Sequence, residues 1–143
     1  MGQKIESFSA DDAHRVEKMR SWVRDHYDPD SGDQYDSLEG KLRLIDTIIR
    51  SGWIEPTETL KLQCLGIAFG DVLVQSMGLR WVAVEDEYGR DPALRDDSKT
   101  TLFFPTTTIS KRIERGEAVN VRKLFEDACR AIVKLRTQAD DAS

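Results

Sequence analysis

Apolar residues recur at helical spacing in the first part of the chain and predict two amphipathic helices. The first begins near Ser9 or Asp11, either of which can cap its N-terminus, and extends to about Tyr27. The second covers about residues 37–50, and Gly52 follows it as a C-terminal cap. Each helix has one apolar stripe, so each is expected to pack against a common core.

A third helix, predicted over about residues 58–77, is the most hydrophobic segment of the chain and is expected to be central. Gly66 and Gly70 lie one turn apart within it. A glycine inside a helix costs about 1 kcal/mol relative to alanine, so two of them need a reason. We therefore expect the backbone of another element to approach the helix closely at these glycines.

Beyond Gly78 the pattern changes to that of strands. Residues 81–84 and 100–104 are predicted to pair as a β-hairpin with a long acidic loop between them. A short capped helix that ends at Gly116 and a last helix over about residues 120–137 follow. The sequence thus predicts an α+β fold that is mostly helical: three N-terminal helices, a β-hairpin, a short helix and a C-terminal helix around one core.

The 143 residues, 39% of them hydrophobic and 33% charged, are typical of one domain. We expect it to cover residues 9–137, between a frayed segment at residues 1–8 and a disordered tail at residues 138–143. No apolar run reaches the roughly 20 residues of a membrane span, and the first residues lack a secretory pattern, so a cytoplasmic protein without a membrane partner is expected. The net charge of −5 argues against nucleic acid as the main partner.

Acidic residues gather in two segments. Residues 25–40 hold six acids and no lysine or arginine, and residues 85–97 hold six acids against two arginines. Such patches can steer a basic protein partner, whereas each patch taken singly can also be a solvated loop. The candidate partner-binding residues are Asp33, Asp36, Glu85, Asp86, Glu87 and Asp91.

The first acidic segment partly matches a calcium-binding loop. Four acids fall at positions one, three, nine and twelve of that loop: Asp28, Asp30, Asp36 and Glu39. However, Gly32 occupies the fifth position, where a ligand oxygen is expected, and Asp33 occupies the sixth, where glycine permits the turn. This is a weak calcium candidate, and a solvated acidic loop is the alternative.

Asp71 lies within the most hydrophobic helix and needs a partner if it is buried. The favoured interpretation pairs it with Arg112 or Arg115, and the alternative makes it a general base in a cleft with those arginines. Ser110, Lys111 and the two arginines also form a candidate anion site near a helix start, with simple capping as the alternative.

Catalytic chemistry has little support in the sequence. The two histidines, His14 and His26, lie on the polar first helix, and neither belongs to a nucleophile–base motif. The glycine-rich pattern of a nucleotide site is also absent. We therefore predict no catalytic residues and no cofactor, and lean away from an enzyme.

A set of short motifs spans the chain from about residue 60 to residue 135. They are Leu65-Gly66, Phe69-Gly70-Asp71, Trp81-Val82, Glu85-Asp86-Glu87-Tyr88-Gly89, Pro105 and Ile109-Ser110-Lys111-Arg112. In this combination the chain resembles a bacterial family of small uncharacterised proteins, domain-of-unknown-function family 3806. The resemblance implies a bacterial cytoplasmic α+β domain and carries over no catalytic residues. Some small acidic proteins of this build also resemble immunity proteins of bacterial competition systems, in fold and composition only.

These observations favour a non-enzymatic protein-binding module, and its sharpest form is an immunity-type protein that neutralises a partner through acidic loops. One alternative is a small-ligand binder or enzyme with a cleft around Asp71, Arg112 and Arg115. A second alternative is an oligomeric scaffold subunit, of which a homodimer is the simplest case.

Overall fold

The computed structural model describes residues 3–25, 34–52, 54–97 and 101–141. These residues form an α+β fold that is mostly helical, as the sequence predicts. The helices are α1 (Ala10–Asp25), α3 (Leu38–Ser51), α4 (Thr59–Met77), α5 (Thr106–Glu114) and α6 (Val121–Asp141). The strands are β1 (Lys4–Glu6), β2 (Arg80–Asp86), β3 (Gly89–Asp96) and β4 (Thr101–Phe103).

The predicted start of α1 and the predicted boundaries of α3 and α4 are confirmed to within two residues, and the predicted end of the first helix, near Tyr27, lies outside the described residues. Local capping marks the starts of α1 and α3. Ser9 and Asp12 form a capping box: the Asp12 backbone N–H donates to Ser9 Oγ (3.1 Å), and the Ser9 N–H donates to Asp12 Oδ2 (2.9 Å). Ser37 Oγ accepts from the Gly40 N–H (2.9 Å) at the start of α3. Gly52, with φ of 70°, ends that helix as predicted.

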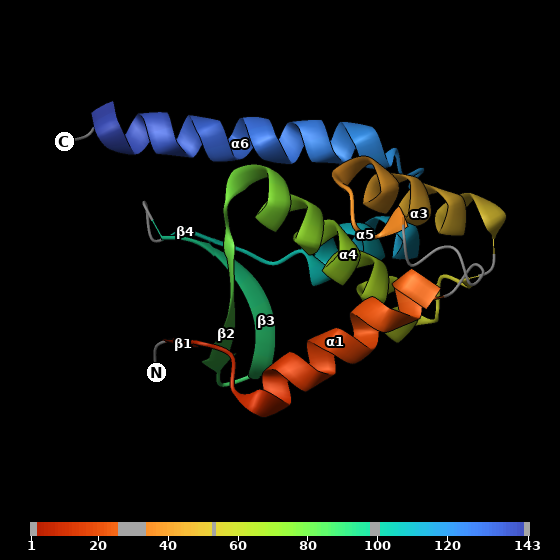
Figure 1. Ribbon diagram of the computed structural model, residues 1–143, viewed down its shortest axis with the longest axis horizontal. Coiled ribbons are helices and arrows are strands. Elements are labelled where there is room, and N and C mark those ends of the chain that lie inside the picture. Colours follow the sequence, from red (N-terminus) through yellow and green to blue (C-terminus); the bar gives the residue numbers. More distant parts are fainter. Residues whose placement is uncertain (1–2, 26–33, 53, 98–100, 142–143) are drawn as a thin grey trace.

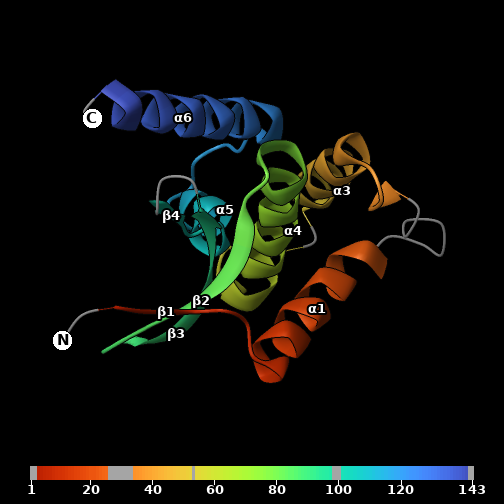
Figure 2. The same cartoon turned by 60° about the vertical axis from the view of Figure 1, so that its left-hand side comes forward.

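Helix α4 is the centre of the molecule and contacts each of the other described helices. Figures 1 and 2 show it between the sheet and the surrounding helices, with α6 lying across one end. The expected close approach of another element's backbone is confirmed at Gly66, whereas at Gly70 side chains approach instead. A Cβ on Gly66 would lie 2.5 Å from the carbonyl oxygen of Pro105, and a Cβ on Gly70 would lie 2.5 Å from the Trp81 ring. Only glycine lets α5 and β2 pack this closely against the helix.

The sheet has the order β1-β2-β3-β4 with antiparallel neighbours, and its pairing differs from the prediction. Strand β2 pairs with β3 across a tight turn in which Asp86 and Gly89 are opposite each other, so most of the expected acidic loop is strand. The expected partner, residues 100–104, contributes β4, which pairs with residues 94–96. The prediction missed β3 because the strand contains Pro92, and proline argues against a strand inside a sheet. Pro92 is tolerated here because the described part of β4 does not pair with this part of β3, which is therefore an edge.

Both ends of the chain also extend further into regular structure than predicted. Residues 4–6, which we expected to fray, form β1 on the free edge of β2, with Ile5 opposite Val84. Helix α6 continues to Asp141, beyond its predicted end at Thr137. Within the described ranges, no helix combines the length and the apolar character that crossing a bilayer requires.

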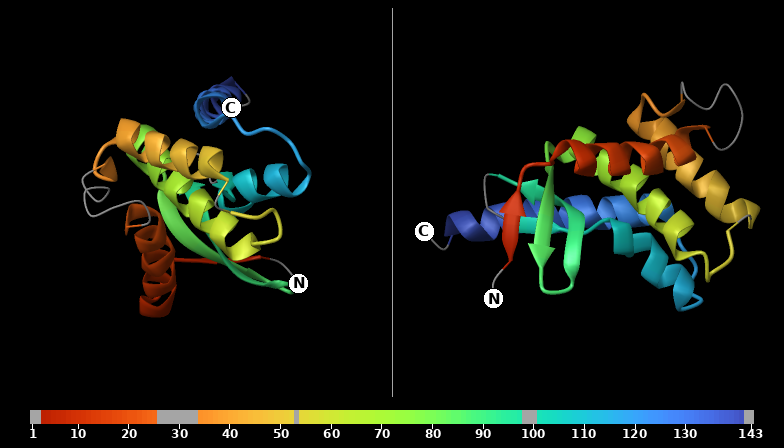
Figure 3. Two further views of the ribbon diagram at one scale, coloured as in Figure 1. Left: turned by 90° about the vertical axis from the view of Figure 1, so that its right-hand side faces the viewer. Right: turned by 90° about the horizontal axis from the view of Figure 1, so that it is seen from below.

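The two faces of the sheet have different surroundings. Trp81 belongs to the main core, which the helices share, and Arg90 on the same face reaches α1. Val82, Val84 and Ala93 form a separate small cluster on the other face. The described helices lie to one side of β2 and β3 and above them (Figures 1 and 3), and the cluster on the second face is buried with Leu102 of β4 packed against it.

Candidate functional site

The turn between β2 and β3 holds an aromatic ring outside the protein. Asp86 Oδ1 accepts a hydrogen bond from the backbone N–H of Tyr88 (2.8 Å). Gly89 follows with φ of 137°, a conformation that side chains rarely adopt. Tyr88, which immediately precedes Gly89, is 88% exposed. A defined turn therefore presents this ring to solvent.

Acidic side chains surround the ring, as the sequence predicts. Glu85, Glu87 and Asp91 are exposed, and within the described ranges neither Glu87 nor Asp91 has an ion-pair partner. Glu85 lies 3.9 Å from Arg90, which is a long contact. We call residues 85–88 together with Asp91 the hairpin tip. It carries negative charge that the rest of the described chain does not neutralise.

Arg90 anchors the hairpin tip to the body of the protein. Its Nε and Nη2 donate to the two carboxylate oxygens of Asp12 (2.9 and 2.7 Å), and its Nη1 donates to Glu6 Oε1 (2.7 Å). The hydrogen bond from Arg90 holds the pKa of Asp12 well below its usual range. One side chain of β3 therefore fixes both β1 and the start of α1 beside the turn. No local sequence pattern indicates this clamp, because its members are far apart along the chain.

The described end of the other acidic segment, at Asp36 and Glu39, lies near the start of α3. Asp36 is exposed just before α3, and Glu39 in the first turn of α3 forms an ion pair with Arg122 of α6. Figures 1 and 2 place α3 and the β2–β3 turn at opposite ends of the molecule, so Glu39 lies far from the hairpin tip. Asp33 lies outside the described residues.

The calcium candidate receives no support from the part that is visible. Asp28 and Asp30 lie outside the described residues, and Glu39 is committed to Arg122. Among the residues that the structure describes, no group of three or more potential metal ligands lies close together.

Asp71 is the centre of a closed hydrogen-bond network. Arg20 of α1 binds it with two hydrogen bonds, from Nε to Oδ2 (2.6 Å) and from Nη2 to Oδ1 (3.0 Å). Trp81 Nε1 donates to Oδ1 (2.9 Å), and the Tyr35 hydroxyl donates to Oδ2. The Asp71 side chain is 11% exposed. Four donors thus satisfy one nearly buried carboxylate, and they connect α1, α4, β2 and the segment before α3.

Lys41 and Gln75 extend this network next to Tyr35. Burial, followed by the negative charge of Asp71, raises the pKa of Tyr35, so its hydroxyl remains a donor. The buried Lys41 donates from Nζ to Gln75 Oε1 (2.7 Å) and lies 5.2 Å from the centre of the Tyr35 ring. Burial lowers the pKa of Lys41. The network is therefore a structural connection between elements.

The predicted arginine partners of Asp71 are wrong. Arg112 donates to the Thr108 carbonyl (2.8 Å) within α5, and Arg115 lies 3.7 Å from Glu117. Helix α5 packs at the Gly66 level of α4, whereas Asp71 faces α1 and β2. A signal for the true partner was present in the sequence: Arg20 lies on the buried stripe of α1 together with Val16 and Val23. A cation on such a stripe requires an acid nearby.

The candidate anion site on α5 is not assembled either. Ser110 is 2% exposed, and its hydroxyl donates back to the Thr106 carbonyl (3.2 Å). The hydroxyls of Thr107 and Thr108 donate to the Phe104 carbonyl (3.3 and 3.4 Å). Lys111 is exposed, and neither it nor Arg112 or Arg115 lies with Asp71. The hydroxyls therefore complete the helix start instead of facing a ligand.

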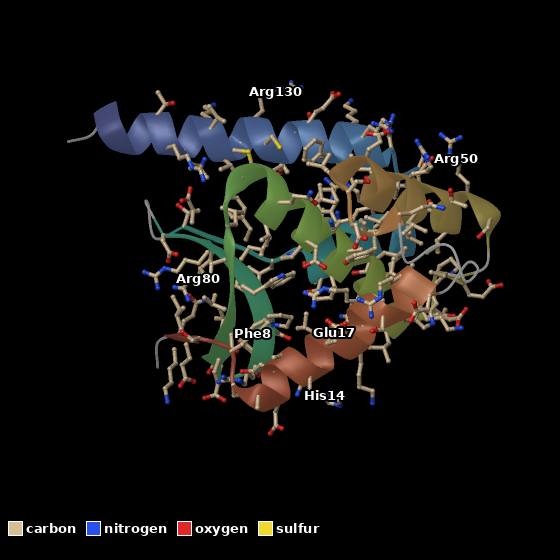
Figure 4. The ribbon with its side chains drawn as sticks, viewed as in Figure 1. Phe8, His14, Glu17, Arg50, Arg80 and Arg130 are labelled. Carbon is tan, nitrogen blue, oxygen red and sulfur yellow. The ribbon has the colours of Figure 1, made fainter. Side chains whose placement is uncertain are left out.

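The described histidine lies away from these clusters. His14 is exposed on α1, and Figure 4 shows it pointing away from the body of the protein. Phe8, labelled in the same view, stacks on Trp81 with ring centroids 6.1 Å apart, which adds packing next to the Asp71 network. His26 lies outside the described residues.

Comparisons with known proteins place the chain in a family. No curated protein matches it. A crystal structure from Bacteroides thetaiotaomicron VPI-5482 shares its fold, with a TM-score of 0.74 at 16% sequence identity; the match covers 90% of this chain and 48% of that one. This chain thus spans about half the length of that neighbour, and such identity shows the fold alone. The model of a domain of unknown function, DUF3806, matches residues 41–125, from α3 into α6. Since this match covers more than half of the chain and includes the motifs that suggested the resemblance, the chain belongs to the DUF3806 family.

Proposed function

We propose that this chain is a non-enzymatic protein-binding module whose hairpin tip engages a basic partner protein. One observation carries the proposal: a hydrogen-bonded turn holds Tyr88 88% exposed among acidic side chains. Tyrosine is enriched among the residues that dominate binding energy at protein interfaces, because it buries a large area at a small entropic cost. The ring is the natural anchor, and the acids are the rim around it.

The surroundings of the turn support this proposal. The Arg90 clamp and the Asp86 hydrogen bond already fix the backbone, so a partner would not have to order the loop on binding. The unpaired charges of Glu87 and Asp91 would increase the rate of encounter with a positively charged surface. The partner that fits is a protein with lysines or arginines around an apolar recess.

The resemblance and the composition also support a finer form of this proposal. We propose that the module acts in a bacterial cytoplasm as an immunity-type protein, which neutralises a basic partner by covering its functional surface. Its small size, its net charge of −5 and its acidic tip are compatible with that role.

Charge reversal at the tip tests the function. The wild-type chain, the double variant Glu85→Lys/Glu87→Lys, and a control with the same charge change, Glu55→Lys/Glu126→Lys, serve as baits in lysate of the native host. Glu55 and Glu126 are exposed and lie away from the tip. A partner that the wild type and the control retain, and that the tip variant loses, supports the proposal. No partner, or equal retention by all three baits, contradicts it.

A second candidate function rests on α6. Val133 and Leu135 on this helix are 53% and 38% exposed, and Phe125, Cys129 and Val133 line one side of it at four-residue spacing. Such a surface favours self-association, which is the scaffold alternative. Light scattering that gives the mass of a monomer at high concentration would remove this candidate, whereas a dimer that Val133→Asp dissociates would support it.

A further inference from the structure

A pocket of about 350 Å³ lies where α1, the first turn of α4, the start of α5 and the middle of β3 meet. Its polar lining side chains are Arg15, Lys18, Gln63 and Thr106. Its apolar lining residues are Met19, Leu60 and Pro92. The pocket is separate from both the Asp71 network and the turn that carries Tyr88.

The four polar side chains are uncommitted. None of them makes a hydrogen bond or an ion pair with any other residue that the structure describes, although Thr106 is only 8% exposed. Arginines elsewhere on the same helix and on β3, Arg20 and Arg90, are held by carboxylates. Polar groups that converge on a pocket without internal partners are what a ligand site provides.

The charge of the pocket is positive. Arg15 and Lys18 lie one turn apart on α1 and supply two cations. Asp91 borders the pocket as well, but its register partner is Val84, which belongs to the buried cluster on the other face of the sheet. Because successive residues of a strand point to opposite faces, Asp91 belongs to the face of the Val84 cluster and Pro92 faces the helices. The ligand that fits is an anion.

The edge of β3 limits the size of the occupant. Among the described residues, β4 pairs with residues 94–96 and no described strand pairs with the edge beside the pocket. Pro92 has no N–H to offer there, which prevents a peptide from adding a continuous strand. The volume is also at the lower end of the roughly 300–1,000 Å³ range of ligand pockets. A small molecule fits better than a peptide.

We propose that this pocket binds a small organic carboxylate with an apolar body. The planar guanidinium of Arg15 matches a carboxylate with two hydrogen bonds, and Lys18 adds a second positive charge. Met19, Pro92 and Leu60, which is 67% exposed without a ligand, cover the apolar body. Gln63 and Thr106 can each donate and accept, so they bind one further polar group of the ligand.

Three probes with the same tail and different heads test this site: hexanoate, hexanol and hexylammonium. Methyl NMR spectra of the full chain follow Met19 and Leu60, with Val133 on α6 as an exposed reference methyl. Hexanoate is expected to give saturable shifts at Met19 and Leu60, and to bind at least about tenfold more tightly than hexanol or hexylammonium. Equal binding of the three probes, shifts as large at Val133, or no saturable shift up to the solubility limit of hexanoate would overturn the proposal.

Charge variants provide the second arm. Lys18→Glu is expected to weaken hexanoate binding at least about tenfold and to strengthen hexylammonium binding. Lys134→Glu on α6 makes the same charge change on an exposed lysine away from the pocket and is expected to change neither. Arg15→Gln is the second pocket variant, should Lys18→Glu perturb the fold, and it too must weaken hexanoate. Unchanged hexanoate binding in folded pocket variants refutes the site.

Discussion

Arg20 on α1 and Asp71 on α4 form a two-point ion pair, with Nε–Oδ2 and Nη2–Oδ1 distances of 2.6 and 3.0 Å. Trp81 and Tyr35 donate to the same carboxylate from two other parts of the chain. The pair therefore joins elements that hydrophobic packing alone would leave free to slide. Asp71 therefore stabilises the fold, and its substitution is expected to lower the free energy of unfolding.

Asp71→Ala is expected to destabilise the protein by about 3–5 kcal/mol, because it leaves four donors without an acceptor in a nearly buried site: Arg20 Nε and Nη2, the Trp81 N–H and the Tyr35 hydroxyl. Arg20 keeps its other ion pair, with Glu17. Urea unfolding followed by circular dichroism measures this change. Asp46→Ala, which removes an exposed ion pair with Arg50, is the control and should cost less than about 1 kcal/mol. A loss at Asp71 no larger than the control would show that the network does not stabilise the fold.

Gly66→Ala is expected to destabilise the protein by roughly 1–3 kcal/mol, although alanine is the better helix former by about 1 kcal/mol. The new methyl group would lie 2.5 Å from the Pro105 carbonyl oxygen, and backbone cannot yield as cheaply as the end of a side chain. Thermal and urea unfolding test this directly. A stabilised variant would mean that α5 does not pack on α4 at this distance.

The Arg90 clamp gives the protein an acid-sensitive stability. Its hydrogen bonds lower the pKa of Asp12 in the folded state below the ordinary value of 3.8. The contribution is therefore present above that value and is lost as the pH falls through the lowered folded-state pKa. In urea unfolding as a function of pH, Arg90→Gln should be less stable than wild type at neutral pH and show a flatter acid limb. Arg50→Gln, an exposed control, should keep the wild-type slope, and equal slopes for Arg90→Gln and wild type would count against the clamp.

Tyr35 makes a contribution to stability that is lost at alkaline pH, whereas the contribution of Asp12 is lost at acid pH. Burial and Asp71 raise the pKa of Tyr35 in the folded state above its ordinary value of 10.0. Its contribution is complete below that value and declines as the pH rises beyond it, because the unfolded chain ionises first. Tyr35→Phe should remove this decline from the stability curve measured by urea unfolding. If the stability of Tyr35→Phe declines at alkaline pH as steeply as that of wild type, ionisation of Tyr35 does not cause the decline.

Local patterns predicted the helices, and distant contacts determined what the sequence could not show. Ser9 and Gly52 are signals that act within one turn, and the structure confirms both as caps. Ser37, at the predicted start of the second helix, caps α3 over the same short distance. Strand β3 was missed because Pro92 and several acids interrupt its apolar pattern, and only its edge position makes the proline acceptable.

In the candidate site, too, some features follow from the local sequence and others depend on contacts between distant residues. The acidic, exposed character of the hairpin tip follows from residues 85–88 themselves, whereas the partner of Asp71 is 51 positions away along the chain. Choosing Arg20 over Arg112 and Arg115 requires the packing of α1 against α4. The apolar stripe of α1 contained a hint of it, since Arg20 shares that stripe with Val16 and Val23.

The affinity of the tip for its captured partner tests the central claim most directly. The partner isolated with the wild-type chain is titrated by calorimetry with wild type, with Tyr88→Ala, and with Leu60→Ala as a control at another exposed hydrophobic residue. We expect Tyr88→Ala to weaken binding by about 2 kcal/mol or more, roughly thirtyfold, and Leu60→Ala to leave it unchanged. If Tyr88→Ala, folded as judged by circular dichroism, binds the partner as tightly as wild type, the hairpin tip is not the binding site.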